Sequence, residues 1–167
     1  MIQAKKTSIA IIFALLMLIT YDIVQADQRE LSHKDSLAYY SYGKDRVSQK
    51  NLNYGVKFMQ EYLEKPGAQK TESGMVYQIL TEGNGAKPAS SSSKVRVNYQ
   101  GRLISGKVFD DSYKRGEPAE FGLNQVIGGW TEILQLMPVG STWEVVIPPE
   151  LAYGSRGIAG VIPENSV

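Results

Sequence analysis

The sequence contains no cysteine and a single histidine, His33. Without cysteine the chain cannot form disulfides, iron–sulfur clusters or thiolate zinc sites, and it carries no catalytic thiol. One histidine cannot build a multi-histidine metal centre, and a Ser-His-Asp triad would depend on that residue alone. His33 lies beside Lys34 and Asp35, a setting typical of a solvated surface residue. We therefore predict neither a metal nor a cofactor.

The chain also lacks an excess of charge of either sign. Lys and Arg total 18 against 17 for Asp and Glu, which gives a formal net charge of +1. Binding to polyanions draws on clustered basic residues, so we predict no nucleic-acid partner. The length of 167 residues, 43% of them hydrophobic, suits one main core with an appendage.

The first 26 residues have the pattern of a secretory signal peptide. Lys5 and Lys6 precede an apolar run over residues 9–19, and Val24-Gln25-Ala26 offers a cleavage site after Ala26. The alternative is a retained membrane anchor, which needs about 20 apolar residues. Asp22 interrupts the run before that length is reached. We predict that residues 1–26 form a signal peptide and that the protein is exported.

Residues 27–66 are predicted to form a helical segment. Between residues 31 and 65 there is no proline, Ser32 with Asp35 offers a start signal, and Pro66-Gly67 a stop. The pattern fits two amphipathic helices or one bent helix, and the apolar stripe needs a partner. That partner is a second copy of the chain, giving a homodimer, or the following domain. The stripe comprises Leu37, Tyr40, Lys44 and Val47, followed by Leu52, Val56, Met59 and Leu63.

After Gly67 the sequence changes to short strand-like runs separated by glycine, proline and serine. One helix is predicted in this part, on the face formed by Trp130, Ile133, Leu134 and Met137. The fold class is therefore α+β, an antiparallel β-sheet wrapped around one short helix. The predicted strands are Met75–Leu80, Val95–Tyr99, a hairpin of Arg102–Ile104 with Lys107–Phe109, and Thr142–Ile147.

Four segments in this part resemble the signature segments of FKBP-type peptidyl-prolyl isomerases. The similarity runs from about Gly74 to the last residue, and residues 67–167 are interpreted as the isomerase domain. Upstream, Asn51 to Leu80 is similar to the N-terminal region of Mip-like and FkpA-like bacterial members, which implies a dimer in the periplasm or outer membrane of a Gram-negative bacterium. The four segments are Val97–Leu103, Gly106–Ser112, Val126–Trp130 and Ala152–Gly154.

The resemblance implies an apolar pocket that accelerates rotation about X-Pro bonds, a reaction that needs no nucleophile because no bond is broken. Its substrates would be proline-containing polypeptides, and its ligands would include macrolides of the FK506 or rapamycin type. Ile127 would donate its backbone N–H and Tyr153 its hydroxyl to substrate carbonyls. The implied catalytic residues are Tyr99, Phe109, Asp110, Ile127, Trp130 and Tyr153, and the implied substrate-binding residues are Phe121, Val126, Val161 and Ile162.

Family members continue past the segment matching Val161-Ile162-Pro163 with a strand that closes the sheet, whereas the present sequence stops at Val167. We therefore expect the last strand of the domain to be missing from this chain, at a cost in stability through unpaired backbone groups. Two alternatives to a working isomerase follow. One is a non-catalytic peptide-binding chaperone that uses the same pocket, and the other is an inactive truncated homologue.

Overall fold

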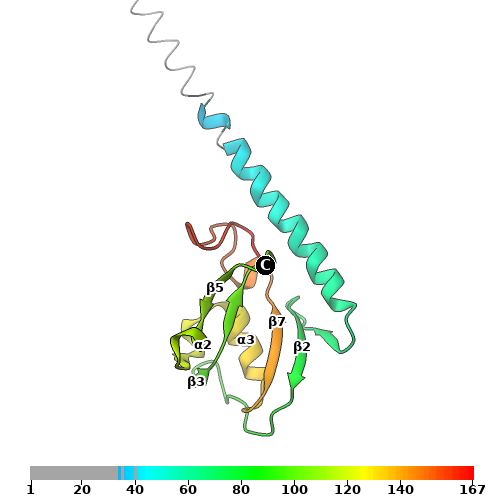
Figure 1. The fold of residues 1–167 in the computed structure, drawn as a ribbon, viewed down its shortest axis with the longest axis vertical. Helices are drawn as coiled ribbons and strands as arrows, with labels where there is room; N and C mark the ends of the chain where they lie inside the picture. Colours follow the sequence, from blue (N-terminus) through cyan, green and yellow to red (C-terminus); the bar gives the residue numbers. More distant parts are fainter. Residues whose placement is uncertain (1–33, 35, 40) are drawn as a thin grey trace, which may run out of the picture. The chain divides into compact units, whose positions relative to one another are not determined.

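The computed structural model describes residues 34, 36–39 and 41–167 (Figure 1). The chain divides into two compact units, Met1–Asp45 and Arg46–Val167. Several predictions fall on residues outside the described ranges: the signal peptide, the start signal at Ser32 and Asp35, the place of Tyr40 in the apolar stripe, and a solvated His33. Within the described ranges, no helix has both the length and the apolar character that a bilayer crossing requires.

Residues 41–63 form a helix. It ends shortly before Pro66 and Gly67, where the sequence predicts a stop. Gly67 has a φ of +80°, which only glycine adopts without strain, and this conformation helps the chain to turn away from the helix. Inside the second unit, Phe58, Met59 and Tyr62 of this helix pack against two strands of the same unit. This face of the helix is therefore covered by its own domain.

The packed face differs from the stripe predicted from the sequence. Met59 of that stripe packs on the domain, but Val56 and Leu63 stay 55% and 42% exposed. The contact runs instead along the face of Asn51, Gly55 and Tyr62, with Asn51 donating to the carbonyl of Glu164 at 2.8 Å. Gly55 is buried there because its missing side chain leaves room for Val167.

The second unit is built from short strands and helices, which confirms the α+β class (Figure 1). Glycine, proline and serine between the apolar runs keep each element short. In chain order the elements are β1 (Ala68–Lys70), β2 (Val76–Thr81), β3 (Lys94–Val97), β4 (Gln100–Arg102), β5 (Val108–Asp111), α2 (Ser112–Arg115), β6 (Ala119–Gly122), the 3₁₀ turn η1 (Leu123–Gln125), α3 (Gly128–Leu136), β7 (Thr142–Val146) and the 3₁₀ turn η2 (Pro149–Leu151).

The strands of the described residues pair in three antiparallel sheets rather than in one continuous sheet. One sheet has the order β1-β2-β7, and β3 pairs with β6 and β4 with β5. Val76 lies opposite Val146 in the first sheet, and Tyr77 stacks on Trp143 with their ring centroids 4.8 Å apart. Among these residues β7 pairs on one side only, with β2.

The prediction of a single helix in this part is wrong, because α2 forms a further turn of helix. Asp111 caps it, since its carboxylate accepts hydrogen bonds from the N–H groups of Tyr113 and Lys114. Gly116 ends it with a φ of +79°. The predicted strand Val95–Tyr99 is also shorter than expected: it ends at Val97, and the chain then turns into β4.

The deepest core joins the first sheet to α3. Met75 is fully buried, and Val76 and Ile133 are 1% and 3% exposed. A side chain on Gly129 would come within 2.6 Å of Ile147 and 3.2 Å of Met75, so this glycine allows α3 to lie close to the sheet. The same approach fixes Trp130, the next residue of α3, relative to the strands.

Replacing Met75 with alanine should lower the free energy of unfolding by about 2–5 kcal/mol, because the substitution leaves a cavity in a close-packed core. The matched control is Leu80→Ala in β2, whose side chain is 58% exposed and should change stability by less than about 0.5 kcal/mol. Urea unfolding followed by circular dichroism measures both. Equal losses in the two variants would contradict this placement of the core.

Candidate active site

Three aromatic rings meet, one from α3, one from β6 and one from the link between β3 and β4. The Trp130 ring, on α3, lies 4.8 Å from Tyr99 and 5.4 Å from Phe121 of β6, both in edge-to-face geometry. Tyr99 and Phe121 are themselves 6.4 Å apart. Such contacts fix ring orientation beyond simple burial. All three rings were expected in the site on resemblance, and the structure brings them together.

A second pair of rings is formed by Phe109 and Tyr153. Their centroids are 6.4 Å apart and the planes are nearly perpendicular. Phe109 belongs to β5 and packs on Gly101 of β4, where an added Cβ would come within 2.7 Å of the ring. Glycine at 101 is therefore needed for the ring to lie against the backbone.

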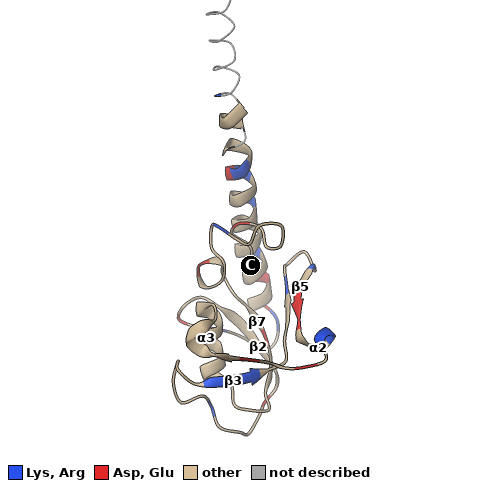
Figure 2. Ribbon diagram, turned by 90° about the vertical axis from the view of Figure 1, so that its left-hand side faces the viewer, with Lys and Arg blue, Asp and Glu red and all other residues tan. Residues whose placement is uncertain are grey.

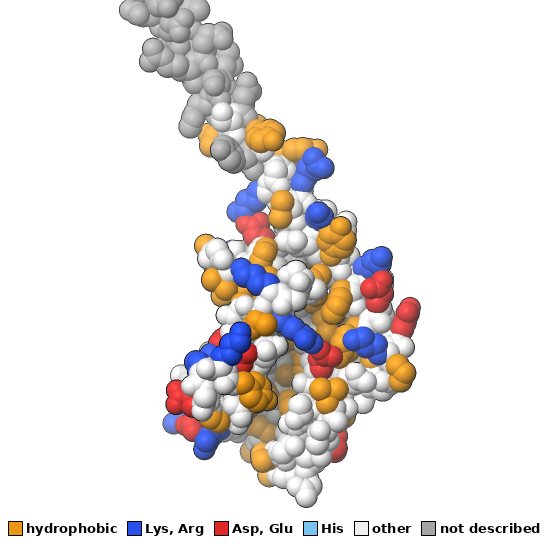
Figure 3. Space-filling model, viewed as in Figure 1, with side chains coloured by type: hydrophobic (Ala, Val, Ile, Leu, Met, Phe, Trp, Pro, Cys, Tyr) orange, Lys and Arg blue, Asp and Glu red, His pale blue; other side chains and the backbone are white. Residues whose placement is uncertain are grey.

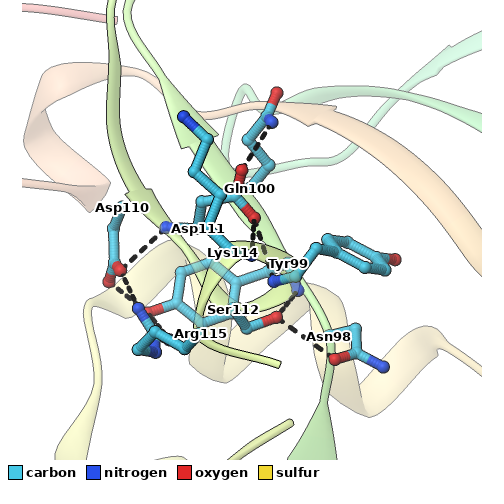
Figure 4. Close-up of polar contacts among 9 residues, drawn as sticks. Asn98, Tyr99, Gln100, Asp110, Asp111, Ser112, Lys114 and Arg115 are labelled. Carbon is cyan, nitrogen blue, oxygen red and sulfur yellow. Dashed lines mark hydrogen bonds and ion pairs between the residues drawn. The ribbon is translucent and has the colours of Figure 1, made fainter. Parts of the chain in front are cut away.

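Tyr99 of the first ring group is hydrogen-bonded to Asp110, the neighbour of Phe109 in the chain (Figure 4). The Tyr99 hydroxyl donates to one carboxylate oxygen of Asp110, which directly follows Phe109 in the sequence. Arg115 donates to the other oxygen, and the backbone N–H of Asp111 donates to it at 2.8 Å. The guanidinium of Arg115 also lies 5.5 Å from the centre of the Tyr99 ring. Figure 2 shows the acidic strand β5 next to the basic helix α2.

These contacts determine the protonation states of Asp110 and Tyr99, the polar groups at the edge of the rings. The hydrogen bond from Tyr99, helped by Arg115, lowers the pKa of Asp110 against the opposing effect of burial. Burial, followed by the hydrogen bond to Asp110, raises the pKa of Tyr99, while Arg115 opposes the rise. At neutral pH the site therefore holds an ionised Asp110 and a protonated Tyr99.

Buried groups around the start of α2 hold Tyr99 in place (Figure 4). Ser112 is fully buried, accepts the N–H of Tyr99 at 2.8 Å, and donates its own N–H to the Tyr99 carbonyl at 2.9 Å. Its hydroxyl also bonds to Asn98 at 3.2 Å. The hydrogen bond from Gln100 lowers the pKa of Asp111, which keeps the α2 cap charged.

The remaining predicted residues occupy two loops. Val126 and Ile127 form the link from η1 to α3, one turn before Trp130, and Ile127 is the N-cap of α3. As an N-cap residue it keeps its own N–H outside the hydrogen-bond ladder of the helix. Ile162 is buried and bridges to Ile158, and the carbonyl of Val161 accepts a bond from Lys107 at 3.5 Å. In the part of the chain described, no ring contact or polar contact joins these last two residues to the aromatic rings.

Sequence reasoning missed three residues that support this arrangement: Gly101, Ser112 and Arg115. The signal for Ser112 was present, because Asp110-Asp111-Ser112 is typical turn and capping chemistry. Arg115 becomes visible only with α2, whose single turn brings it back to Asp110. Gly101 acts across the β4–β5 pair, and a sequence does not report contacts between strands.

Comparison with known proteins identifies the family. Residues 85–167 match the family described as FKBP-type peptidyl-prolyl cis-trans isomerase, and residues 22–79 match the domain amino terminal to it. The chain belongs to the FKBP-type isomerase family. It is 55% identical over 112 residues to an FKBP-type 22 kDa peptidyl-prolyl cis-trans isomerase of Escherichia coli. The matched region covers 67% of this chain and 54% of that protein.

Two further relatives match a larger share of this chain. The outer membrane protein MIP of Legionella longbeachae is 44% identical over 144 residues, covering 86% of this chain and 59% of that protein. The crystal structure of FkpA from Escherichia coli superposes with a TM-score of 0.71 at 40% identity, covering 75% of this chain and 59% of that one. The chain thus spans somewhat more than half the length of these FKBP-type relatives, and the α+β fold is the fold of the family.

The lowered pKa of Asp110 should make its contribution to stability depend on pH. The native state binds the Asp110 proton more weakly than the unfolded state, so the contribution is complete above the ordinary pKa of about 3.8. It is lost as the pH falls through the lowered native pKa. The difference in unfolding free energy between the wild type and Asp110→Asn should therefore shrink as the pH falls below about 3.8 toward the acid limit of folding.

Urea titrations at a series of pH values measure this difference. In a Tyr99→Phe background the carboxylate loses its principal donor, so the same comparison should depend less on pH. A difference between wild type and Asp110→Asn that stays constant down to the acid limit would show that the Tyr99–Asp110 bond does not perturb the carboxyl group.

Proposed function

We propose that this protein is a peptidyl-prolyl cis-trans isomerase that acts on X-Pro bonds of exported polypeptides. The observation that carries the proposal is the edge-to-face packing of Tyr99 and Phe121 on Trp130, with a charged Asp110 at the edge of the rings. Family membership supports it, since the related proteins of Escherichia coli carry this activity in their names.

The barrier to rotation about an X-Pro bond is about 18–20 kcal/mol, because the nitrogen lone pair is conjugated with the carbonyl. Water stabilises the planar, charge-separated amide by hydrogen bonding to its carbonyl oxygen. An apolar, aromatic surface that takes up the proline ring removes that water and favours the twisted transition state. The rings of Trp130, Tyr99 and Phe109 are suited to this task, because they offer large apolar area with fixed orientation.

Few polar groups are needed beside such a surface, and each has a proposed role. The N–H of Ile127 and the hydroxyl of Tyr153 donate to carbonyls that flank the proline and so orient the peptide. Asp110 places a negative charge at the edge of the rings, close to the rotating imide. Phe121 and Val126 extend the apolar wall, and Val161 and Ile162 contact residues next to the proline.

We also propose that the protein works outside the cytoplasm, after residues 1–26 are removed. The pattern of Lys5, Lys6 and the apolar run supports export. The Legionella longbeachae relative, which matches 86% of this chain, is named as an outer membrane protein. Periplasm or outer membrane of a Gram-negative bacterium is therefore the proposed location. A macrolide of the FK506 or rapamycin type is a proposed ligand of the aromatic surface.

A homodimer through the N-terminal helix is the proposed assembly. With Tyr62 and Met59 covering the domain, four apolar side chains stay exposed on two flanks of the helix within the second unit. Figure 3 shows hydrophobic side chains at the surface of this helix. On each flank the two apolar residues are seven positions apart, which is the spacing of apolar residues in paired helices of a coiled coil. Exposed apolar groups in this number favour burial against a second chain. The residues are Val47 and Tyr54 on one flank and Val56 and Leu63 on the other, 42–56% exposed.

Tyr153→Phe should lower kcat/KM about tenfold, because it removes one substrate hydrogen bond worth about 1.4 kcal/mol in the transition state. The measurement is NMR exchange spectroscopy on a proline tetrapeptide, which requires no coupling protease. Tyr113→Phe is the matched control, since Tyr113 is 65% exposed and outside the two groups of rings. Addition of FK506 should abolish the wild-type rate.

A wild-type sample that is folded by circular dichroism but has no rate above background would reject the enzymatic proposal. If the same sample suppressed aggregation of an unfolded protein, the non-catalytic chaperone would be favoured. An unfolded wild-type sample would favour the inactive truncated homologue. Equal rates in Tyr153→Phe and wild type would remove the hydroxyl from the mechanism.

The dimer proposal is tested by adding charge to one flank. The double variant Val56→Lys, Leu63→Lys should sediment as a monomer at concentrations where the wild type sediments as a dimer, because lysines at the interface lose their hydration. The control Lys57→Glu changes the charge at an exposed position between the two flanks of the same helix and should leave the dimer intact. A wild type that is monomeric throughout the accessible concentration range refutes the proposal.

A further inference from the structure

A single carboxylate, that of Glu144 in β7, connects the N-terminal helix to β4 outside the proposed pocket. The Tyr62 hydroxyl donates to one of its oxygens at 2.7 Å, and Arg102 of β4 donates to the other. Tyr62 is 2% exposed, whereas Glu144 and Arg102 are 30% and 57% exposed at their side chains. A carboxylate that accepts on both oxygens holds its partners in fixed positions.

Arg102 lies at an irregularity in the β4–β5 pair. Gly101 pairs with Asp110, but Arg102 pairs with Val108, so Phe109 has no direct partner in β4. This is a β-bulge, in which an extra residue turns its side chain away from the regular alternation. The bulged residue is the one whose ring packs on Gly101 and faces Tyr153.

Arg102 can influence the Phe109 ring through its place at the end of β4 and in the β4–β5 pair. Its side chain is held by Glu144, its backbone ends the short strand β4, and its position in the pair defines where the bulge falls. Asp110, paired with Gly101, follows the bulge directly and accepts from Tyr99. A shift of Arg102 along β5 would therefore move both Phe109 and Asp110.

We propose that Arg102 is a positioning residue for the pocket, anchored by Glu144 and Tyr62, and that the N-terminal helix orders Phe109 and Asp110 through this connection. The proposal deepens the proposed isomerase function and rests on it for its effect on rate. Arg102 does not touch substrate in this scheme, because it acts on the bulge. The helix then has a role in the pocket besides assembly.

Burial, followed by the hydrogen bond to Glu144, raises the pKa of Tyr62, so the hydroxyl keeps its proton and remains a donor over the whole physiological range. The ammonium of Lys65 lies 4.0 Å from the centre of the Tyr62 ring and holds its other side. The hydroxyl of Tyr62 therefore stays a donor to Glu144 throughout that range.

Arg102→Met tests the proposal in the full chain, because it removes the charge and keeps the length of the side chain. We expect kcat/KM for the proline tetrapeptide to fall about fivefold, chiefly through a higher KM, since a displaced Phe109 weakens substrate binding. Tyr62→Phe should change the rate in the same direction by about twofold. Arg102→Lys, which keeps the charge, should recover part of the loss.

The matched control is Arg96→Met. Arg96 on β3 pairs with Glu120 at 3.9 Å, both side chains are more than 60% exposed, and neither belongs to the bulge. A purely structural role of Arg102 would lower the thermal midpoint and leave kinetic constants measured far below it unchanged. The double variant of Tyr62 and Arg102 should lose less than the product of the single losses, because both act on one carboxylate.

A second measurement is independent of activity. The Phe109 ring lies on Gly101, so the α-protons of Gly101 should show a ring-current shift in NMR spectra. That shift should diminish in Arg102→Met and persist in Arg96→Met. Unchanged Gly101 signals in Arg102→Met, or changed signals with unchanged kcat and KM, would overturn the positioning role. An inactive wild type would reject the proposed function, and the Gly101 signals would then still decide whether Arg102 holds the bulge.

Discussion

The hydrogen bond from Tyr99 to Asp110 is the contact on which the site depends. Through its ring Tyr99 packs on Trp130, and through its hydroxyl it fixes the carboxylate beside Phe109. Separately, these would be an apolar cluster and a surface acid, both common in small domains. Joined by one side chain, they form an apolar surface with a single charge at a defined edge. Ser112 holds Tyr99 in place, since its hydroxyl accepts the N–H of Tyr99 and its own N–H donates to the Tyr99 carbonyl.

The parts of the site that could be predicted from the sequence are those carried by residue type and order. Trp130, Tyr99 and Phe109 stand in motifs whose order alone indicates the family, and the apolar face of α3 follows from its periodicity. The α+β class follows from short strand-like runs around one clear helical pattern. These features depend on neighbours in the chain, which a sequence displays directly.

The features that could not be predicted depend on contacts between distant segments. The four residues of α2 are too few for a periodic pattern, so Arg115 gave no sign that it returns to Asp110. The bulge at Phe109 is a property of the β4–β5 pairing, and nothing within either strand marks it. For the N-terminal helix the apolar positions were evident, but which of them face the domain is decided by the shape of β2 and β7. Tyr62 and Met59 contact the domain, whereas Val56 does not.

The two tryptophans of the chain stand in different surroundings. Trp130 belongs to the ring group of the site, while Trp143 stacks on Tyr77 in the first sheet and keeps its indole N–H buried without a hydrogen-bond partner. Their fluorescence therefore carries two separable signals, one from the site and one from the sheet. Replacing either residue with phenylalanine would leave an intrinsic optical probe of the other region, so loosening of the site can be distinguished from melting of the sheet without an added label.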